Sequence, residues 1–225
     1  MSAATARAAA PAAPRPGLPA IAPYALPTQS DLPKARAPWV AERQRAALLV
    51  HDMQRYFLRP YAAEASPLAP VVANIARLVA HCRHVGIPIF YTAQDVKQDR
   101  RDRGLQADLW GPGMTDTAEH RPIVPELAPN DTDIVLVKHR YSAFQRSNLE
   151  PLMRARGRDQ LVICGVYAHI GCLLTAADAF MRDIEPFFIA DAVADFSREK
   201  HDSAIAYVAD VCGVPLLAQQ AVDDL

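Results

Sequence analysis

The chain has 225 residues, of which 51% are hydrophobic and 22% are charged, so it is long enough to bury a full core. Its formal net charge of -1 supplies no basic field for a phosphate backbone, and we expect no nucleic-acid partner. Charges or prolines interrupt every apolar run before it reaches the roughly 18 residues that a membrane span requires, so we expect a soluble, cytoplasmic protein without a membrane partner.

Residues 1–20 are mostly Ala and Pro, with Arg7, Arg15 and no acidic residue. They lack the apolar core of a secretory signal, and their prolines would break an amphipathic helix. We interpret them as a disordered leader in front of a single domain over residues 21–225. Prolines continue through Pro38, so we expect an extended surface segment there and regular structure from near Glu42.

Six short apolar runs follow, and helical patterns separate most of them. The runs predict strands at 46–50, 87–91, 133–137, 160–164, 187–190 and 214–217. Apolar residues at intervals of three and four predict helices at 71–82, 149–156, 171–182 and 204–212. Each crossover helix must bury its apolar stripe on a sheet face, so this alternation favours a parallel sheet. We predict a three-layer α/β/α sandwich with a six-stranded, mostly parallel, Rossmann-like sheet.

Between the second and third runs, residues 95–128 show little periodicity. A long loop inside a compact domain usually has a function, such as covering a site.

The four cysteines lie in apolar runs and form no C-x-x-C pair, so we expect reduced core thiols, as is usual in the cytoplasm: Cys82, Cys164, Cys172 and Cys212.

Polar residues follow the central strands where each strand ends. Asp52 follows the first strand, Gln94 the second and Lys138 the third, while 165–171 follows the fourth and opens a helix. In open α/β sheets ligands bind beyond the carboxyl ends of the strands. Each residue alone has an ordinary structural explanation, such as a helix cap or a solvated charge. Their coincidence at one edge favours a functional site.

Other kinds of site lack their signatures. His51, His139 and His169 lie near the strand ends, but no H-x-H or H-E-x-x-H motif accompanies them, so we expect no metal and no other cofactor. There is no G-x-S-x-G motif for a serine nucleophile. Acid, base and electrostatic catalysis remain.

Several segments together resemble the isochorismatases. These segments are LLVHDMQRYF at 48–57, YTAQ at 91–94, WGPG at 110–113, VKHRYSAF at 137–144, GVYAHIGC at 165–172, and 178–197. The similarity runs from about Ile21 to the C-terminus and implies an isochorismatase-like fold. In the wider superfamily, cysteine hydrolases such as nicotinamidases carry a nucleophilic Cys at the start of the helix after the fourth strand.

Gly171 occupies that position here. Cys172 is the next residue, but one step along a helix rotates a side chain by about 100°, so its thiol should face the core. The resemblance is therefore to the members that hydrolyse a vinyl ether and release pyruvate. That chemistry needs a proton on the methylene carbon, then attack by water on the oxocarbenium ion, and no thiol.

The resemblance also implies roles for individual residues. Asp52 is the general acid, Lys138 orients it and offsets charge, and the backbone near Gly171 contacts the substrate. The family's substrate contacts fall on Gln94, Arg103 and Tyr167, and the pocket residues around the ring are Phe57, Trp110 and Tyr141. The implied ligand is a small dicarboxylate, and family members are usually homodimers. We also expect no fused carrier-protein domain.

Two substrates remain open, isochorismate of siderophore pathways and 2-amino-2-deoxyisochorismate of phenazine pathways. A third interpretation is a non-catalytic binding protein. The retention of four polar residues argues against it: Asp52, Lys138, Gln94 and Arg103.

The protonation state of Asp52 needs an explanation, because a neighbouring ammonium lowers the pKa of an aspartate, yet a general acid must be protonated. We hypothesise that the dianionic substrate and pocket closure raise the pKa of Asp52, so that a proton is taken up on binding.

Overall fold

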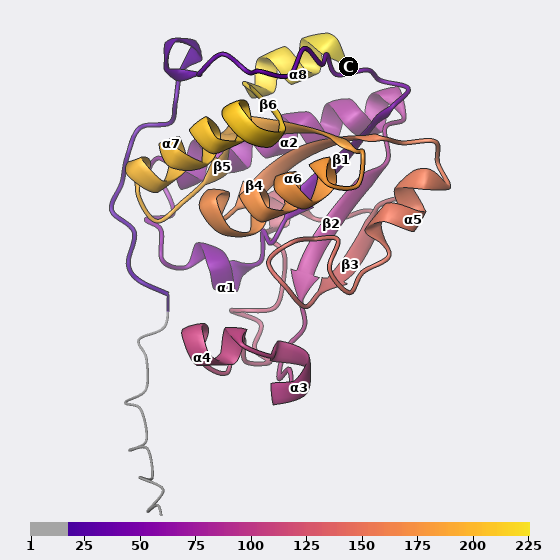
Figure 1. Cartoon of the computed structure of the whole chain (residues 1–225). Coiled ribbons are helices and arrows are strands. Elements are labelled where there is room, and N and C mark those ends of the chain that lie inside the picture. The colour runs from indigo at the N-terminus through magenta and orange to yellow at the C-terminus, as the bar shows by residue number, and fades with distance from the viewer. Residues whose placement is uncertain (1–17) are drawn as a thin grey trace, which may run out of the picture.

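The computed structural model describes residues 18–225, in which a six-stranded sheet lies between layers of helices (Figure 1). Residues 1–17, most of the expected leader, lie outside the described residues. The sheet order is β3-β2-β1-β4-β5-β6, and every neighbouring pair is parallel. The predicted sandwich is confirmed, with a sheet that is wholly parallel. The strands are β1 (Ala46–His51), β2 (Ile89–Gln94), β3 (Ile134–Lys138), β4 (Gln160–Val166), β5 (Glu185–Ala194) and β6 (Val214–Leu216).

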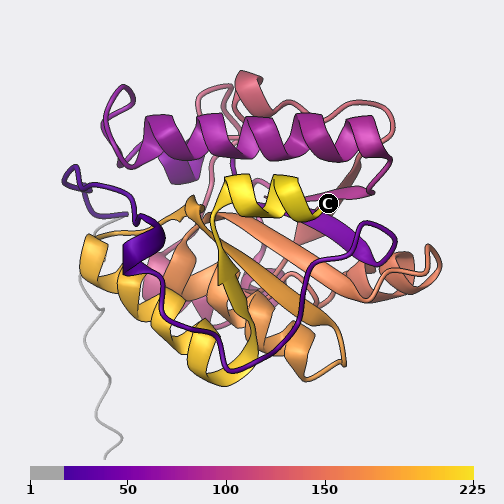
Figure 2. The same ribbon diagram turned by 90° about the horizontal axis from the view of Figure 1, so that it is seen from above.

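Both faces of the sheet are covered (Figure 2). On one face lie α2 (Leu68–Val85) and α8 (Ala218–Asp224); on the other lie α5 (Leu149–Arg154), α6 (Leu173–Phe180) and α7 (Arg198–Tyr207). Strand β1 contributes side chains to both cores. Leu48 and Val50 pack on the face covered by α2 and α8, and Ala47 and Leu49 pack on the opposite face. Successive side chains of a strand point to opposite faces, so a strand buried on both sides is apolar throughout.

Local signals explain most helix ends. Helix α2 ends at Gly86, which adopts the left-handed conformation with φ 79°. Helix α7 begins at Arg198, earlier than expected, because Ser197 caps it by accepting a hydrogen bond from the Lys200 amide at 3.3 Å. Its first turns are polar and therefore lack the apolar periodicity on which the prediction rested. Helix α8 was not predicted.

The turn after β4 also differs from expectation. The helix predicted to begin at Gly171 is preceded by a π turn over Ala168–Cys172, and α6 starts only at Leu173. A second π turn, Val208–Cys212, follows α7. Strand β2 begins at Ile89, two residues later than predicted, and Gln94 is its last residue.

Two irregular segments lie near the carboxyl ends of the strands. After β2, residues 95–118, here called the cover segment, contain the short helices α3 (Arg100–Arg103) and α4 (Gln106–Trp110) (Figure 1). Asp99 caps α3 by accepting from the amides of Arg101 and Asp102. The second segment follows β1 and contains the four-residue helix α1 (Arg55–Leu58). No helix in residues 18–225 is both long and apolar enough to cross a membrane.

The chain before β1 runs extended along the surface, as expected, with one 3-10 turn at Gln29–Asp31 (Figure 2). The amide of Ile21 donates to the carbonyl of Pro60 at 2.9 Å, and the Ile21 side chain is buried. The first described residues therefore pack against the segment that follows β1.

Candidate active site

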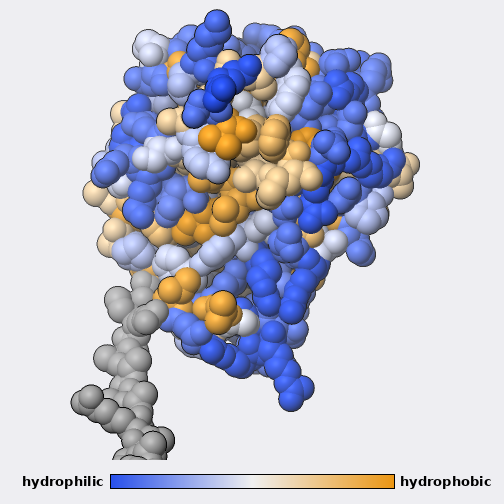
Figure 3. Space-filling view, viewed as in Figure 1, coloured by the Kyte–Doolittle hydropathy of each residue, from blue (hydrophilic) through white to orange (hydrophobic). Residues whose placement is uncertain are grey.

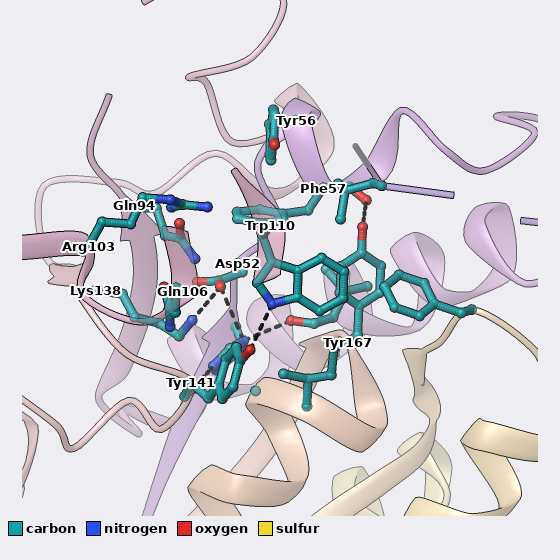
Figure 4. A pocket seen from close by; sticks show the side chains of 16 residues that line it. Asp52, Tyr56, Phe57, Gln94, Arg103, Gln106, Trp110, Lys138, Tyr141 and Tyr167 are labelled. Carbon is teal, nitrogen blue, oxygen red and sulfur yellow. Dashed lines mark hydrogen bonds and ion pairs between the residues drawn. The ribbon is translucent and has the colours of Figure 1, made fainter. Parts of the chain in front are cut away.

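A cavity lies at the carboxyl ends of the central strands, and its empty volume of about 520 Å³ includes space open to solvent (Figure 4). The segments that follow β1, β3, β4 and β5 supply its walls together with the cover segment after β2. The nine residues predicted from the sequence all line it: Asp52, Phe57, Gln94, Arg103, Trp110, Lys138, Tyr141, Tyr167 and Gly171. Arg103, Gln106 and Trp110 are among the lining residues, so residues 95–128, predicted to cover a site, do cover this cavity.

Asp52 is held by hydrogen bonds from two neighbouring strands. Lys138 Nζ donates to its Oδ2 at 2.7 Å, and the Thr92 hydroxyl donates to its Oδ1 at 2.7 Å. The Asp52 amide donates back to Thr92 Oγ1 at 3.1 Å. Asp52 and Lys138 are 4% and 3% exposed, so this ion pair is shielded from water. Asp52 also has φ 52°, an uncommon left-handed conformation for a residue other than glycine, which places its carboxylate at the cavity.

The pKa of Asp52 reflects two opposing effects. Burial favours the neutral acid and raises the pKa, whereas the Lys138 ammonium, the neighbouring His51, and the hydrogen bonds from Lys138 and Thr92 favour the carboxylate. The second group prevails, and the pKa of Asp52 lies below its ordinary value. Asp52 is thus a carboxylate at neutral pH when no substrate is bound.

Arg103 lies in the cover segment, 5% exposed, and its Nε donates to the Gly111 carbonyl at 2.6 Å. A Cβ on Gly113 would lie 2.5 Å from Arg103 Nη1, so a larger residue there would displace the guanidinium from this position. Burial lowers the pKa of Arg103 from its ordinary value, yet arginine remains a cation at neutral pH. Arg103 is therefore a preorganised cation at the cavity.

Two further pairs of hydrogen-bonded residues shape the walls. Trp110 Nε1 donates to the Tyr141 hydroxyl at 2.7 Å, which ties the cover segment to the loop after β3 (Figure 4). At the end of β2, the Gln94 amide donates to Gln54 Oε1 at 2.7 Å and the Gln54 amide group donates to the Gln94 carbonyl at 3.1 Å. Gln54 thus fixes the backbone of Gln94.

The apolar wall is aromatic. The Tyr167 hydroxyl donates to the Phe57 carbonyl at 2.6 Å, and the Tyr167 ring lies 4.4 Å from that of Phe196, centroid to centroid. Phe196 was not predicted as a site residue. The other lining residues that the sequence left unassigned are Leu18, His51, Tyr56, Gln106, Val166 and Ile170. Only His51 carried a signal, as the polar neighbour of Asp52. Leu18 lies within the expected leader.

Serine, threonine and cysteine are all missing from the described residues that line the cavity. Cys172 is fully buried in the core formed by α5, α6 and α7, as predicted, and the other three cysteines are buried and free. Nor do residues 18–225 contain a group of three His, Cys, Asp or Glu side chains that could hold a metal ion. What the cavity offers is a buried carboxyl, two cations and aromatic walls. These groups suit proton transfer to a small anion.

Comparisons with known proteins show the family to which the chain belongs. Residues 46–220 match the isochorismatase domain model. The chain is 51% identical to the isochorismatase of Bacillus subtilis over 208 residues, which cover 92% of this chain and 67% of that protein. It is 49% identical to the phenazine biosynthesis protein PhzD1 of Pseudomonas aeruginosa over 207 residues, covering 92% and 99% respectively. A cysteine hydrolase from Pseudomonas syringae shares the fold, with a TM-score of 0.76 at 24% identity over 85% of this chain and 96% of that chain.

Proposed function

Because the chain belongs to the isochorismatase family and is an isochorismatase-type hydrolase, we propose that it cleaves the vinyl ether of isochorismate. The products are 2,3-dihydro-2,3-dihydroxybenzoate and pyruvate. The observation that carries this proposal is the buried Asp52, hydrogen-bonded to Lys138 and Thr92 in a cavity whose described lining offers no hydroxyl or thiol of Ser, Thr or Cys.

In the proposed mechanism the Asp52 carboxyl donates its proton to the methylene carbon of the enolpyruvyl group. The ether oxygen stabilises the resulting oxocarbenium ion, and water adds to the cationic carbon. The adding water returns a proton to the Asp52 carboxylate. The hemiketal then collapses: its hydroxyl proton passes to the ring oxygen as the bond between the ketal carbon and that oxygen breaks, which releases pyruvate and the ring diol. A general acid and water are sufficient for this reaction, and no covalent enzyme intermediate is required.

Charge balance supports uptake of a proton when the substrate binds. The substrate carries two carboxylates, and the cavity supplies two cations, Arg103 and Lys138, together with the Asp52 carboxylate. An ionised Asp52 would leave one uncompensated negative charge in a buried site, which is costly. Protonation of Asp52 balances two carboxylates with two cations and releases Lys138 to pair with a substrate carboxylate. The acid that catalysis needs is therefore produced by binding.

Titration calorimetry tests this coupling. The ligand is the lactyl ether of the ring diol, a dicarboxylate that lacks the double bond and cannot turn over. Measured at pH 7.5 in buffers of different ionisation enthalpy, binding should take up about one proton per site. The Asp52→Asn variant, which has no carboxyl to protonate, is the control and should take up none. Proton release, or equal uptake by both proteins, would contradict the mechanism.

The alternative substrate is 2-amino-2-deoxyisochorismate, and the 49% identity to the phenazine biosynthesis protein favours it as the second candidate. Pyruvate release, coupled to lactate dehydrogenase, should be measured with each substrate, and the higher kcat/KM identifies the preferred one. Nicotinamide serves as the amidase control. Turnover of neither ether would favour the non-catalytic binding protein, and ammonia from nicotinamide would overturn ether hydrolysis.

We further propose a cytoplasmic homodimer without a nucleic-acid partner, in which residues 21–225 form one hydrolase domain. The four buried free cysteines and the net charge of -1 support this proposal. Exposed apolar side chains gather over α6 and the turn after α7 (Figure 3), and they offer a surface for self-association: Leu174, Phe180, Met181, Tyr207 and Val211. Light scattering after gel filtration should give twice the chain mass, and Met181→Glu should reduce it toward one.

A further inference from the structure

His51 forms the cavity wall beside Asp52 and has none of the roles assigned above. It is the last residue of β1 and is fully buried. Its Nδ1 lies 2.8 Å from the Val166 carbonyl oxygen, and its Nε2 lies 3.3 Å from the Tyr141 carbonyl oxygen. Burial lowers the pKa of His51 to about 4, so the ring is neutral at pH 7 and carries one N–H. We assign this N–H to Nδ1, which has the shorter contact.

The ring thereby spans two loops. It donates to the backbone at the end of β4 and contacts the backbone after β3, and the Tyr141 hydroxyl in turn accepts from Trp110 of the cover segment. A side chain that is fully buried and flanked on both edges by backbone has little freedom to move aside.

Beside this ring lies Gly171, in the π turn after β4. A Cβ at this position would lie 2.1 Å from His51 Cε1, 2.7 Å from Nε2 and 2.9 Å from Nδ1. Real Cβ atoms essentially never approach other heavy atoms closer than 3.0 Å. Gly171 does not have a positive φ, so its backbone conformation is open to any residue. The imidazole ring is what requires a glycine at position 171.

Gly165 offers a useful contrast. It also faces His51, but its Cβ would lie 2.1 Å from the His51 carbonyl oxygen and 2.8 Å from the His51 nitrogen, which are backbone atoms. Its φ of 115° independently favours glycine. The backbone of β1 therefore requires glycine at position 165, whereas a single side chain, that of His51, requires glycine at position 171.

We propose that His51 is a positioning residue that reserves the side-chain space at position 171 and excludes any side-chain nucleophile from that wall. If the proposed function holds, His51 thereby commits the cavity to proton transfer by Asp52. The ring fills the volume that a hydroxyl or thiol would need beside the reacting groups, and it leaves only backbone at Gly171 facing the substrate.

A double-mutant cycle tests this assignment. The partner change is His51→Asn, because Asn retains an N–H near the position of Nδ1 for the Val166 carbonyl and lacks Cε1 and Nε2. Gly171→Ala in the wild-type background should lower the melting temperature by about 5 °C or more through overpacking. In the His51→Asn background the same change should lower it by less than about 2 °C.

Pyruvate release provides the functional arm of the same cycle. Gly171→Ala should reduce kcat at least about tenfold, because a displaced His51 disturbs the neighbouring Asp52. The double variant should recover to within about threefold of His51→Asn alone. The matched control is Gly165→Ala, whose clash with backbone should persist in both backgrounds. A merely structural role for His51 would give thermal rescue without recovery of kcat, which would overturn the positioning role.

Alkylation by iodoacetamide then measures the reserved space directly. Gly171→Cys in the His51→Asn background should add one carbamidomethyl group to the native protein, at a rate at least about tenfold above that of Gly171→Cys alone. The His51→Asn parent is the control, because its four cysteines are buried. Equal labelling in both backgrounds, or a harmless Gly171→Ala in the wild type, would overturn the proposal. If the wild type releases no pyruvate but the thermal cycle and labelling hold, the proposed function fails and the reserved space stands.

Discussion

The buried Asp52–Lys138 pair and the cover segment enclose the same cavity but are held in place by different means. Lys138 ends β3, Asp52 directly follows β1, and Thr92 of β2 hydrogen-bonds Asp52, so three neighbouring strands fix the pair. The cover segment has only two short helices, of four and five residues. Side-chain contacts such as the hydrogen bond from Trp110 to Tyr141 connect it to the neighbouring loops. Its surface exposes the apolar side chains of Leu105 and Leu109 (Figure 3). Groups that move a proton need fixed geometry, whereas a segment that admits substrate must be able to open.

Removal of the general acid should have the largest effect. Asp52→Ala is expected to lower kcat for pyruvate release by about 1,000-fold, because no other group in the proposed mechanism protonates the methylene carbon. Circular dichroism and calorimetric binding of the lactyl ether should show a folded protein that still binds. Turnover within tenfold of wild type would remove Asp52 from the mechanism. The Asp52–Lys138 pair would then no longer differ from the cover segment as the part of the cavity that transfers the proton.

Loss of the ammonium should come next. Lys138→Met is expected to lower kcat about 100-fold, since the charge that offsets the substrate carboxylate is gone. It should also reverse the pH dependence that Asp52 gives to stability. In the wild type the lowered pKa of Asp52 contributes stability above its unfolded value, and this is lost as acid protonates it.

Without Lys138, we expect burial, the largest effect on Asp52, to outweigh the remaining effects of His51 and Thr92 and to raise the pKa of Asp52. Its contribution to stability is then present at low pH and is lost as pH rises through the raised pKa. Melting temperatures measured between pH 5 and 8 should therefore fall with rising pH in Lys138→Met relative to the wild type. Parallel curves for the two proteins would show that Lys138 does not set the charge state of Asp52.

A smaller effect, confined to binding, should follow from a change in the cover segment. Arg103→Ala is expected to raise KM about 10- to 100-fold through loss of a charge-assisted hydrogen bond to a carboxylate, while kcat changes less than about threefold. The matched control is Arg101→Ala, an exposed arginine of the same short helix, which should leave KM within about twofold. A fall in kcat with KM unchanged would instead assign the contact of Arg103 to the transition state.

The link between the cover segment and the loop after β3 should matter least. Tyr141→Phe removes the acceptor of the Trp110 N–H and is expected to raise KM about three- to tenfold. Trp110→Phe should act through the same contact. The KM of the double variant should therefore not exceed that of the single variant with the higher KM. Additive losses would mean that the two side chains contact substrate separately.

Much of the site was predictable because it depends on strand ends. A buried apolar strand followed by a polar residue locates the end of the strand to within a residue or two, and parallel strands bring those ends together. Gln94 and Lys138, which pair in register at the ends of β2 and β3, are the clearest example. The cover segment was predicted only as a cover, since its short helices depend on contacts with distant loops such as that of Trp110 with Tyr141.

The missed residues have identifiable causes. Phe196 lies two residues beyond β5, but this strand was predicted to end at Ala190 and runs to Ala194, so the residue was not recognised at a strand end. Leu18 lies in Ala- and Pro-rich sequence that has no periodicity to indicate packing. The role of His51 depends on the distance of its ring from Gly171, which no spacing along the chain conveys.

The order β3-β2-β1-β4-β5-β6 means that the chain adds its second and third strands on one side of β1 and its last three on the other. The segments leaving β1 and β4 therefore diverge, and a crevice opens between them at this topological switch point. Asp52 and Gly171 lie on its two sides, one after β1 and one after β4. The hollow belongs to the winding of the sheet. Exchange of side chains along its rim can thus alter the reaction class while the cavity persists.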